Sequence, residues 1–273
     1  MGPLEVTNDG SPVPLGGVKQ RAALGFLLLH ANEVIPASRL LQALWADEVP
    51  PTARKILHNA ISGLRRTVFE NVSDADSALL TRAPGYLLHV NPACVDLSLF
   101  QCLAERGRSE LARGSWEPAV RLLRQALAFW RGSVLADLTE VGIVWPELAA
   151  VQDSRLTTFE DWVEAELALG RHHEVVGALE IAVATGPTRE RVRGQLMLAL
   201  YRCGQQVEAL EVYRRTKISL AESLGLDPSR GLQELERAIL NHDPILASAV
   251  PDGVAAWLPS RGSVECSTWP DCL

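Results

Sequence analysis

Residues 53–69 read ARKILHNAISGLRRTVF, and this stretch decides how the amino-terminal third of the chain is interpreted. An α-helix turns by about 100° per residue, so residues three, four and seven positions apart share one face. One face of this predicted helix is aliphatic and is expected to pack into a core: Leu57, Ala60, Ile61, Leu64 and Val68. The opposite face and its flanks carry no carboxylate, only basic and polar side chains: Arg54, Lys55, His58, Asn59, Ser62, Arg65 and Arg66.

The side chains on that opposite face are of the kinds that recognise DNA. Arginine and lysine pair with phosphate or guanine, and asparagine pairs with adenine. A solvated basic face is the plainer alternative, because runs of charge are common on protein surfaces. The segments on either side of the helix therefore bear on the choice.

Those flanking segments predict a small mixed domain. Residues 3–16 contain Asn-Asp-Gly, a hairpin turn signal. Residues 17–31 and 35–45 carry apolar side chains at helical spacing. Two prolines followed by Thr52 are predicted to start and cap the next helix. The phrase LLTRAPGYLLHV, residues 79–90, alternates around Pro-Gly and predicts a pair of strands.

A hairpin, three helices and a strand ribbon, in that order, predict a winged helix-turn-helix DNA-binding domain in residues 1–92. The third helix would enter the major groove of DNA. Arg82 would lie at the tip of the ribbon, where a cation can enter the minor groove or meet a phosphate. A solvated arginine in a turn is the alternative for Arg82.

Charge is distributed unevenly along the 273 residues, whose net charge is −7. Residues 1–92 hold eight basic and eight acidic residues, whereas residues 93–245 hold 17 basic and 22 acidic. Contact with nucleic acid is therefore expected from a local patch in the first third. One acidic group is expected to be solvated, or to form a polar docking surface: Glu147, Glu160, Asp161, Glu164 and Glu166.

From residue 93 the pattern is almost purely helical. Candidate helices cover residues 96–113, 116–130, 146–169, 172–185, 188–203, 206–224 and 229–241. Phrases around 167–180 recur around 198–211 with an offset of 31, near the period of tetratricopeptide repeats. This predicts a tetratricopeptide-like domain in 93–245, with a plain helical bundle as the alternative. Residues 246–273 are expected to be a linker or a disordered tail.

Features typical of enzymes and metalloproteins are few. No P-loop, dinucleotide fingerprint, zinc-protease motif or nucleophile elbow is present, so no enzyme and no cofactor are expected. The five cysteines include no CxxC, and His172-His173 is interpreted as a surface pair at a helix start. The amino end does not read as a signal peptide and no run is long enough to span a bilayer, so a cytoplasmic, nucleoid-associated protein without membrane contact is expected.

Several phrases together resemble the SARP-type family of actinobacterial transcriptional regulators. In the first third they are MGPLEV, PVPLGGVKQRAALGFLLLHAN, LLQALWADEVPPTAR, HNAISGLRR and APGYLLHV. The later part is similar to the bacterial transcriptional activation domain of that family through WEPAVRLLRQALAFWRG and EALEVYRRTKISLAESLGLDPSRGLQELERAIL. The resemblance implies an OmpR-type winged helix that reads promoter direct repeats. It also implies a helical domain for self-association, as a homodimer or in tandem on DNA, and for contact with RNA polymerase.

The resemblance also implies which residues touch DNA. On the third helix they are Lys55, Asn59, Ser62, Arg65 and Arg66. Arg82 and Thr81 fall on the wing, and Lys19 and Arg21, at the start of the first helix, fall near the DNA backbone. Gly63 stands where relatives have a larger polar residue, at a cost of about 0.5–1 kcal/mol of helix stability relative to alanine.

The function expected from all of this is a sequence-specific, DNA-binding transcriptional activator. The alternative is a protein–protein interaction scaffold without specific DNA binding. The third helix, free of acidic residues, favours DNA.

Overall fold

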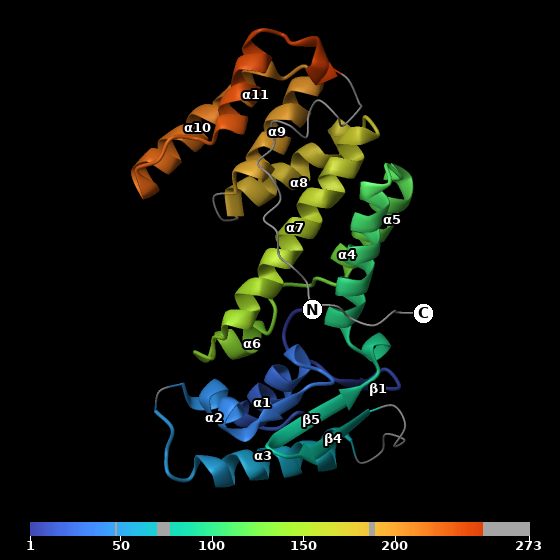
Figure 1. The fold of residues 1–273 in the computed structure, drawn as a ribbon, viewed down its shortest axis with the longest axis vertical. Helices are drawn as coiled ribbons and strands as arrows, with labels where there is room; N and C mark the ends of the chain where they lie inside the picture. The colour runs from blue at the N-terminus through green and yellow to red at the C-terminus, as the bar shows by residue number, and fades with distance from the viewer. Residues whose placement is uncertain (47, 70–76, 186–188, 248–273) are drawn as a thin grey trace. The chain divides into compact units, whose positions relative to one another are not determined.

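The computed structural model describes residues 1–46, 48–69, 77–185 and 189–247. Helices dominate, with a few short strands (Figure 1). The chain forms two compact units. Unit 1 comprises Met1–Leu103 and Gln125–Leu156, and unit 2 comprises Ala104–Arg124 and the chain from Thr157. None of the helices in the described ranges is both long and apolar enough to cross a membrane.

Unit 1 follows the predicted order of elements closely. Its first part contains β1 (Thr7–Asn8), β2 (Ser11–Pro12), α1 (Val18–Leu29), β3 (Val34–Pro36), α2 (Ala37–Trp45), α3 (Ala53–Val68), β4 (Ser77–Arg82), β5 (Gly85–Val90) and η1 (Pro92–Cys94). The antiparallel pair β1–β2 confirms the predicted hairpin. Helix α3 begins where predicted, with Thr52 as its N-cap residue, although the Thr52 side chain makes no capping hydrogen bond.

A three-stranded antiparallel sheet with the order β3-β5-β4 accompanies these helices. The strands β4 and β5 confirm the predicted ribbon, with Arg82 paired to Gly85 beside the turn. Strand β3 was not predicted, because its three residues form a strand only by pairing with β5. A side chain at Gly85 would collide with the backbone, since a Cβ there would lie 1.9 Å from the carbonyl oxygen of Ile35. Glycine is therefore what lets β3 approach β5.

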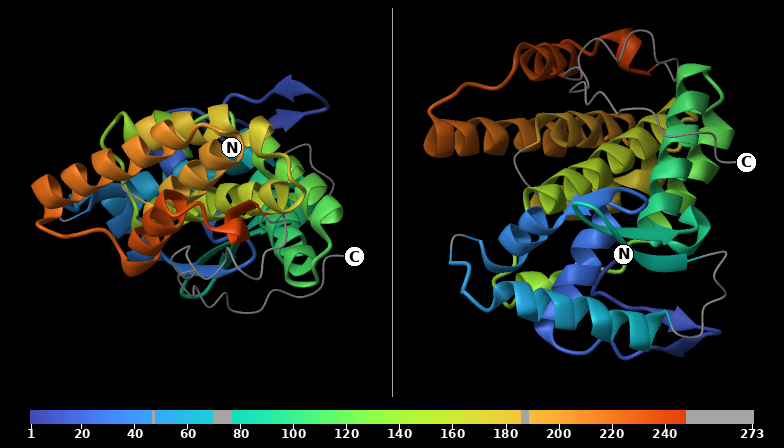
Figure 2. Two further views of the ribbon diagram at one scale, coloured as in Figure 1. Left: turned by 90° about the horizontal axis from the view of Figure 1, so that it is seen from above. Right: turned by 60° about the horizontal axis from the view of Figure 1, so that its bottom comes forward.

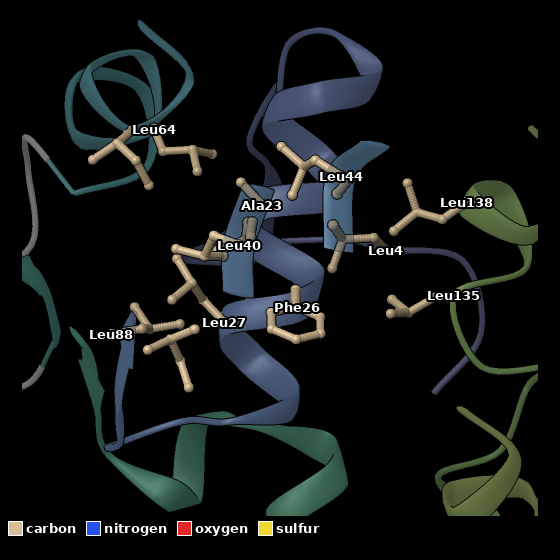
Figure 3. Packing of buried hydrophobic residues seen from close by; sticks show 14 of the residues in the cluster. Leu4, Ala23, Phe26, Leu27, Leu40, Leu44, Leu64, Leu88, Leu135 and Leu138 are labelled. Carbon is tan, nitrogen blue, oxygen red and sulfur yellow. The ribbon is translucent and has the colours of Figure 1, made fainter. Parts of the chain in front are cut away.

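The core of unit 1 is built where α1, α2, α3 and β5 meet (Figure 3). Phe26 and Leu27 of α1, Leu40 of α2, Leu64 of α3 and Leu88 of β5 are all buried. The core also takes in the later segment of unit 1, including α6 (Ala136–Thr139) and the start of α7 (Pro146–Ala168).

That later segment packs directly on α1. The indole of Trp145 meets the ring of Phe26 edge-on, with centroids 5.2 Å apart, and its N–H donates to the carbonyl of Ala43 at 2.9 Å. Leu135 and Leu138 come so close to α1 that a Cβ at Gly25 would lie 3.1–3.2 Å from their methyl groups. The compact unit therefore extends beyond residue 92, the end of the domain drawn from sequence.

The remaining helices agree with the predicted ranges to within three residues at each end. They are α4 (Asp96–Ala112), α5 (Trp116–Ala128), α8 (His172–Thr185), α9 (Glu190–Arg202), α10 (Gln206–Leu224) and α11 (Arg230–Leu240). In unit 2, α8 and α10 both pack against α9, and α11 packs against α9 and α10. The short helix η2 (Pro244–Ala247) follows, and Leu246 within it is buried. The rest of the predicted tail lies outside the described residues.

The expectation that the acidic group on α7 is solvated is wrong. Glu160 is only 4% exposed, and Asp161 and Glu166 are fully buried. Arg189 and Arg191 of the α9 region form ion pairs with Glu160, and Arg191 also pairs with Glu164. Glu166 accepts hydrogen bonds from Arg124 at 2.5 Å and from the indole N–H of Trp162 at 3.0 Å.

Glu147, the fifth member of that acidic group, belongs to unit 1 and is also paired. Its carboxylate lies 3.0 Å from the guanidinium of Arg39 and 3.2 Å from Nε2 of His30. Burial raises the pKa of Glu147, but the backbone hydrogen bond to its carboxylate and the bonds from Arg39 and His30 outweigh burial and lower it. Most of the partners of the acidic group come from distant parts of the chain, which the local charge pattern does not reveal.

Candidate nucleic-acid interface

Helix α3 presents two chemically distinct faces. Leu57, Ala60, Ile61 and Leu64 are at most 4% exposed and Val68 is partly buried, so the predicted core-facing stripe is confirmed. This stripe packs against α1 and α2, and α3 also contacts β4. Figure 2 shows α3 in light blue at the surface of unit 1. Packing on one side fixes which side chains point outward.

The outward face of α3 is basic and polar. The side chains there are exposed: Arg54, Lys55, His58, Asn59, Ser62 and Arg66. Within the described ranges, none of them has a hydrogen-bond or ion-pair partner, and no carboxylate lies on the helix. The cationic and amide groups of this face are therefore available to a ligand.

Arg65 is only half exposed and has a different role. Its Nε donates to the carbonyl of Leu79 at 2.8 Å, and its Nη2 donates to the hydroxyl of Thr81 at 2.8 Å. Two residues from the predicted contact set, Arg65 and Thr81, thus bind each other and tie the carboxyl-terminal end of α3 to β4. Arginine has five N–H groups, so further donors of Arg65 remain.

The turn between β4 and β5 holds the predicted wing arginine. Arg82 is exposed, as are Ala83 and Pro84 beside it. Among the described residues Arg82 makes no ion pair or hydrogen bond through its guanidinium. The bonds of Arg65 to Leu79 and Thr81 join α3 to β4, the strand that ends at Arg82.

The two basic residues of α1 are engaged within unit 1. Lys19 donates to the carbonyl of Leu44 at 2.5 Å and lies over the ring of Trp45, 4.7 Å from its centroid. Partial burial lowers the pKa of Lys19. Arg21 forms an ion pair with Asp137. Both cations therefore already have partners inside the protein.

Gly63 does not belong to the exposed face of α3. It is buried, and a Cβ there would lie 1.9 Å from the side-chain nitrogen of Gln20 on α1. The side-chain oxygen of Gln20 accepts a hydrogen bond from the backbone N–H of Gly17 at 3.0 Å. Gly63 therefore makes room for Gln20 at the α1–α3 contact.

One residue of the outward face was missed by sequence reasoning. Ile56 is 37% exposed and lies beside Lys55, one turn before Asn59. The position of Ile56 on the helical wheel could have revealed its exposure, because it falls outside the aliphatic stripe of α3. An exposed aliphatic group between cations suits the methyl group of thymine.

Comparisons with known proteins agree on one family. Residues 95–240 match the model of the bacterial transcriptional activator domain. The transcriptional regulatory protein MoaR1 of Mycobacterium tuberculosis is 38% identical over 247 residues, which cover 90% of this chain and 79% of MoaR1. The regulatory protein DnrI of Streptomyces peucetius is 35% identical over 261 residues, which cover 94% of this chain and 96% of DnrI.

A solved structure extends the agreement to the fold. Mycobacterium tuberculosis EmbR, solved in complex with a low affinity phosphopeptide, matches with a TM-score of 0.86 and 36% identity, over 94% of this chain and 67% of that one. In the sequence comparison, the chain spans 66% of the transcriptional regulatory protein EmbR. The chain therefore belongs to the SARP-type family of transcriptional regulators, which carry a bacterial transcriptional activator domain.

Proposed function

We propose that this chain is a sequence-specific, DNA-binding transcriptional activator. Residues 1–92 form a winged helix-turn-helix, in which α3 enters the major groove and the β4–β5 turn is the wing. Residues 93–245 form the tetratricopeptide-like activation domain. The proposal rests on one observation: the outward face of α3 carries unpartnered basic and amide side chains while its other face is buried.

The chemistry of that face suits a base edge flanked by phosphates. Asn59 and Ser62 lie along the centre of the face, where an amide reads adenine and a hydroxyl reads several bases. Lys55, Arg66 and the flanking Arg54 and His58 would meet phosphate or guanine. Ile56 would contact a thymine methyl.

The other predicted contacts have secondary roles in this proposal. Arg65 and Thr81 hold the wing against α3 and contact DNA only through the groups left free by their mutual bond. Arg82 reaches the minor groove or its phosphates. Lys19 and Arg21 contribute least, because each is engaged within unit 1.

The helical part would supply self-association and contact with RNA polymerase. Large aliphatic side chains are exposed on its helices, among them Ile181, Val207, Ile218 and Leu224, at 57–75%. Single exposed side chains are common on protein surfaces, so this role is proposed from the match of residues 95–240 to the bacterial transcriptional activator domain. Two copies bound to direct repeats would read more base pairs than one winged helix can.

The experiment is a binding series against salt with the 273-residue chain, a DNA fragment from upstream of its own gene and a random DNA fragment of equal length. We expect tighter binding to the upstream fragment and a steep loss of affinity as salt rises. Each phosphate neutralised should contribute about −0.9 to the slope of log K against log salt.

Substitutions test whether side chains of α3 cause the salt dependence of binding. Lys55→Ala and Arg66→Ala should each reduce its magnitude by about 0.9. Lys217→Ala removes another exposed charge, from α10, and should leave the slope unchanged. Equal binding to both fragments would favour the scaffold alternative and refute sequence-specific recognition.

A further inference from the structure

Three metal-ligating side chains gather at one edge of unit 2. His172 and His173 begin α8, and Cys203 follows the last residue of α9. Sγ of Cys203 lies 3.2 Å from Nδ1 of His173, and the two imidazole rings have centroids 4.6 Å apart. One ligand atom from each of the three residues lies within 4.8 Å of the others. The sequence did not reveal this group, because Cys203 is remote from the histidine pair along the chain.

The repeat in the sequence explains why these residues meet. His172 follows Arg171 and Cys203 follows Arg202, and the offset of 31 makes the two positions equivalent. Each lies at a junction between consecutive helices, His172 at the start of α8 and Cys203 at the end of α9, and α8 and α10 both pack against α9. Helix pairs that stack in this way bring equivalent turns to the same edge.

One nitrogen of this cluster lacks a partner. Nδ1 of His172 is buried and has no hydrogen bond to any described residue. Buried polar atoms are nearly always satisfied, so this nitrogen needs an explanation. A metal ion would satisfy this nitrogen, because a neutral imidazole nitrogen is a common metal ligand.

We propose that His172, His173 and Cys203 bind a zinc ion. Imidazole nitrogen and thiolate sulfur are the donors that zinc prefers, whereas calcium and magnesium take oxygen. Tetrahedral zinc places such ligand atoms about 3.3–3.8 Å apart. The sulfur of Cys203 and the nitrogen of His173 already lie close to that separation.

The most widely separated ligand atoms must approach by about 1 Å to reach that geometry. His173 is exposed at the first turn of α8, so a change of its side-chain rotamer can supply this movement. His242, which is exposed beyond the end of α11, lines the same hollow as His172. His242 or a water molecule would complete the coordination.

The charges around the cluster allow a cation to bind. Arg202 lines the hollow, but its guanidinium is directed to the carbonyls of Leu167 and Leu246 at 2.9 and 2.8 Å. Cysteine binds zinc as a thiolate, so the thiol proton of Cys203 must leave when the ion binds. Zinc would displace that proton to solvent, and the resulting thiolate offsets the positive charge of Arg202.

The experiment uses the reduced 273-residue chain after removal of metal by a chelator. Titration with Zn²⁺ should saturate this site with one ion per chain, and titration with Co²⁺ should give the visible bands of tetrahedral cobalt and a thiolate charge-transfer band. His173→Ala and Cys203→Ser should each weaken zinc binding by at least about tenfold. Cys203→Ser should also abolish the charge-transfer band.

The matched control is Cys94→Ser, which removes an exposed thiol from unit 1. It should bind zinc and cobalt like the parent chain. Far-UV circular dichroism of the metal-free variants checks that each one is folded. Zinc binding that is equal in His173→Ala, Cys203→Ser and the parent would overturn the proposal, as would a parent chain without the cobalt–thiolate band.

Discussion

The contact between Gly63 and Gln20 predicts that two substitutions depend on each other. With Gln20 in place, Gly63→Ala puts a methyl group 1.9 Å from its side-chain nitrogen, so Gln20 must turn away. That movement breaks the hydrogen bond from Gly17, at a cost of about 0.5–1 kcal/mol for an exposed bond of this kind. Replacing glycine by alanine in the middle of a helix stabilises it by about 0.5–1 kcal/mol. The two effects nearly cancel, so Gly63→Ala alone should change stability by less than about 0.5 kcal/mol.

The same substitution should be stabilising once Gln20 is shortened. The three atoms nearest to a Cβ at Gly63 all belong to the side chain of Gln20, and the third is already 4.0 Å away. In a Gln20→Ala background the methyl group meets open space, and Gly63→Ala should stabilise by the full helix-propensity gain of about 0.5–1 kcal/mol. The coupling energy between the two sites is therefore about 0.5–1 kcal/mol.

Amide hydrogen exchange in α1 and α3 measures this coupling within unit 1, without requiring both units to unfold together. A coupling of about 0.7 kcal/mol corresponds to a roughly threefold difference in exchange rate. Gln20→Ala alone supplies the reference for the lost bond. If Gly63→Ala changes protection equally in both backgrounds, Gln20 does not occupy the space over Gly63 and the reasoning is wrong.

Three further predictions concern recognition and stability. Asn59→Ala should alter base preference at one position of the DNA site, by about 1–3 kcal/mol, whereas Arg82→Ala should weaken binding evenly across sequences. Selection from a randomised DNA site, followed by affinity measurements, would show both effects. Equal loss of affinity on all sequences for both variants would contradict these roles. Glu166→Ala should destabilise unit 2 by about 1–3 kcal/mol in thermal unfolding, because the indole N–H of Trp162 loses its acceptor. The control Glu174→Ala removes an exposed carboxylate near the same Arg124 and should cost less than about 0.5 kcal/mol. The lowered pKa of Glu147 contributes stability that is present above pH 4.5, the ordinary pKa, and is lost as pH falls through the lowered pKa. In Glu147→Gln, the stability of unit 1 should therefore fall less steeply with decreasing pH. An unchanged pH dependence would exclude that contribution.

The parts of the fold that sequence predicted well are those set by local periodicity. Helix α3 and its buried stripe follow from residues three and four positions apart, so Leu57, Ile61 and Leu64 could be assigned without a structure. The β4–β5 ribbon could also be predicted from nearby residues, since its strands are joined by one short turn. The outward side chains of α3 follow from the same phase.

Features that depend on distant partners could not be predicted. Strand β3 exists through its pairing with β5, and the buried carboxylate of Glu160 is compensated by arginines from the next helix pair. Arg65 carries the same basic group as Arg66, yet its bond to Thr81 gives it a structural role. The positions of such partners follow from the tertiary fold, and no window of sequence contains both members.

The packing of Trp145 and Leu138 on α1 restricts how this protein can be divided. A fragment that ends at residue 92 would uncover Phe26 and Gly25, which Trp145, Leu135 and Leu138 cover, and would present apolar surface to water. Recombination that transplants only the first ninety or so residues into another regulator would leave the recipient with an incomplete hydrophobic interior. Gene fusions that preserve unit 1 must therefore carry residues 125–156 along with residues 1–103.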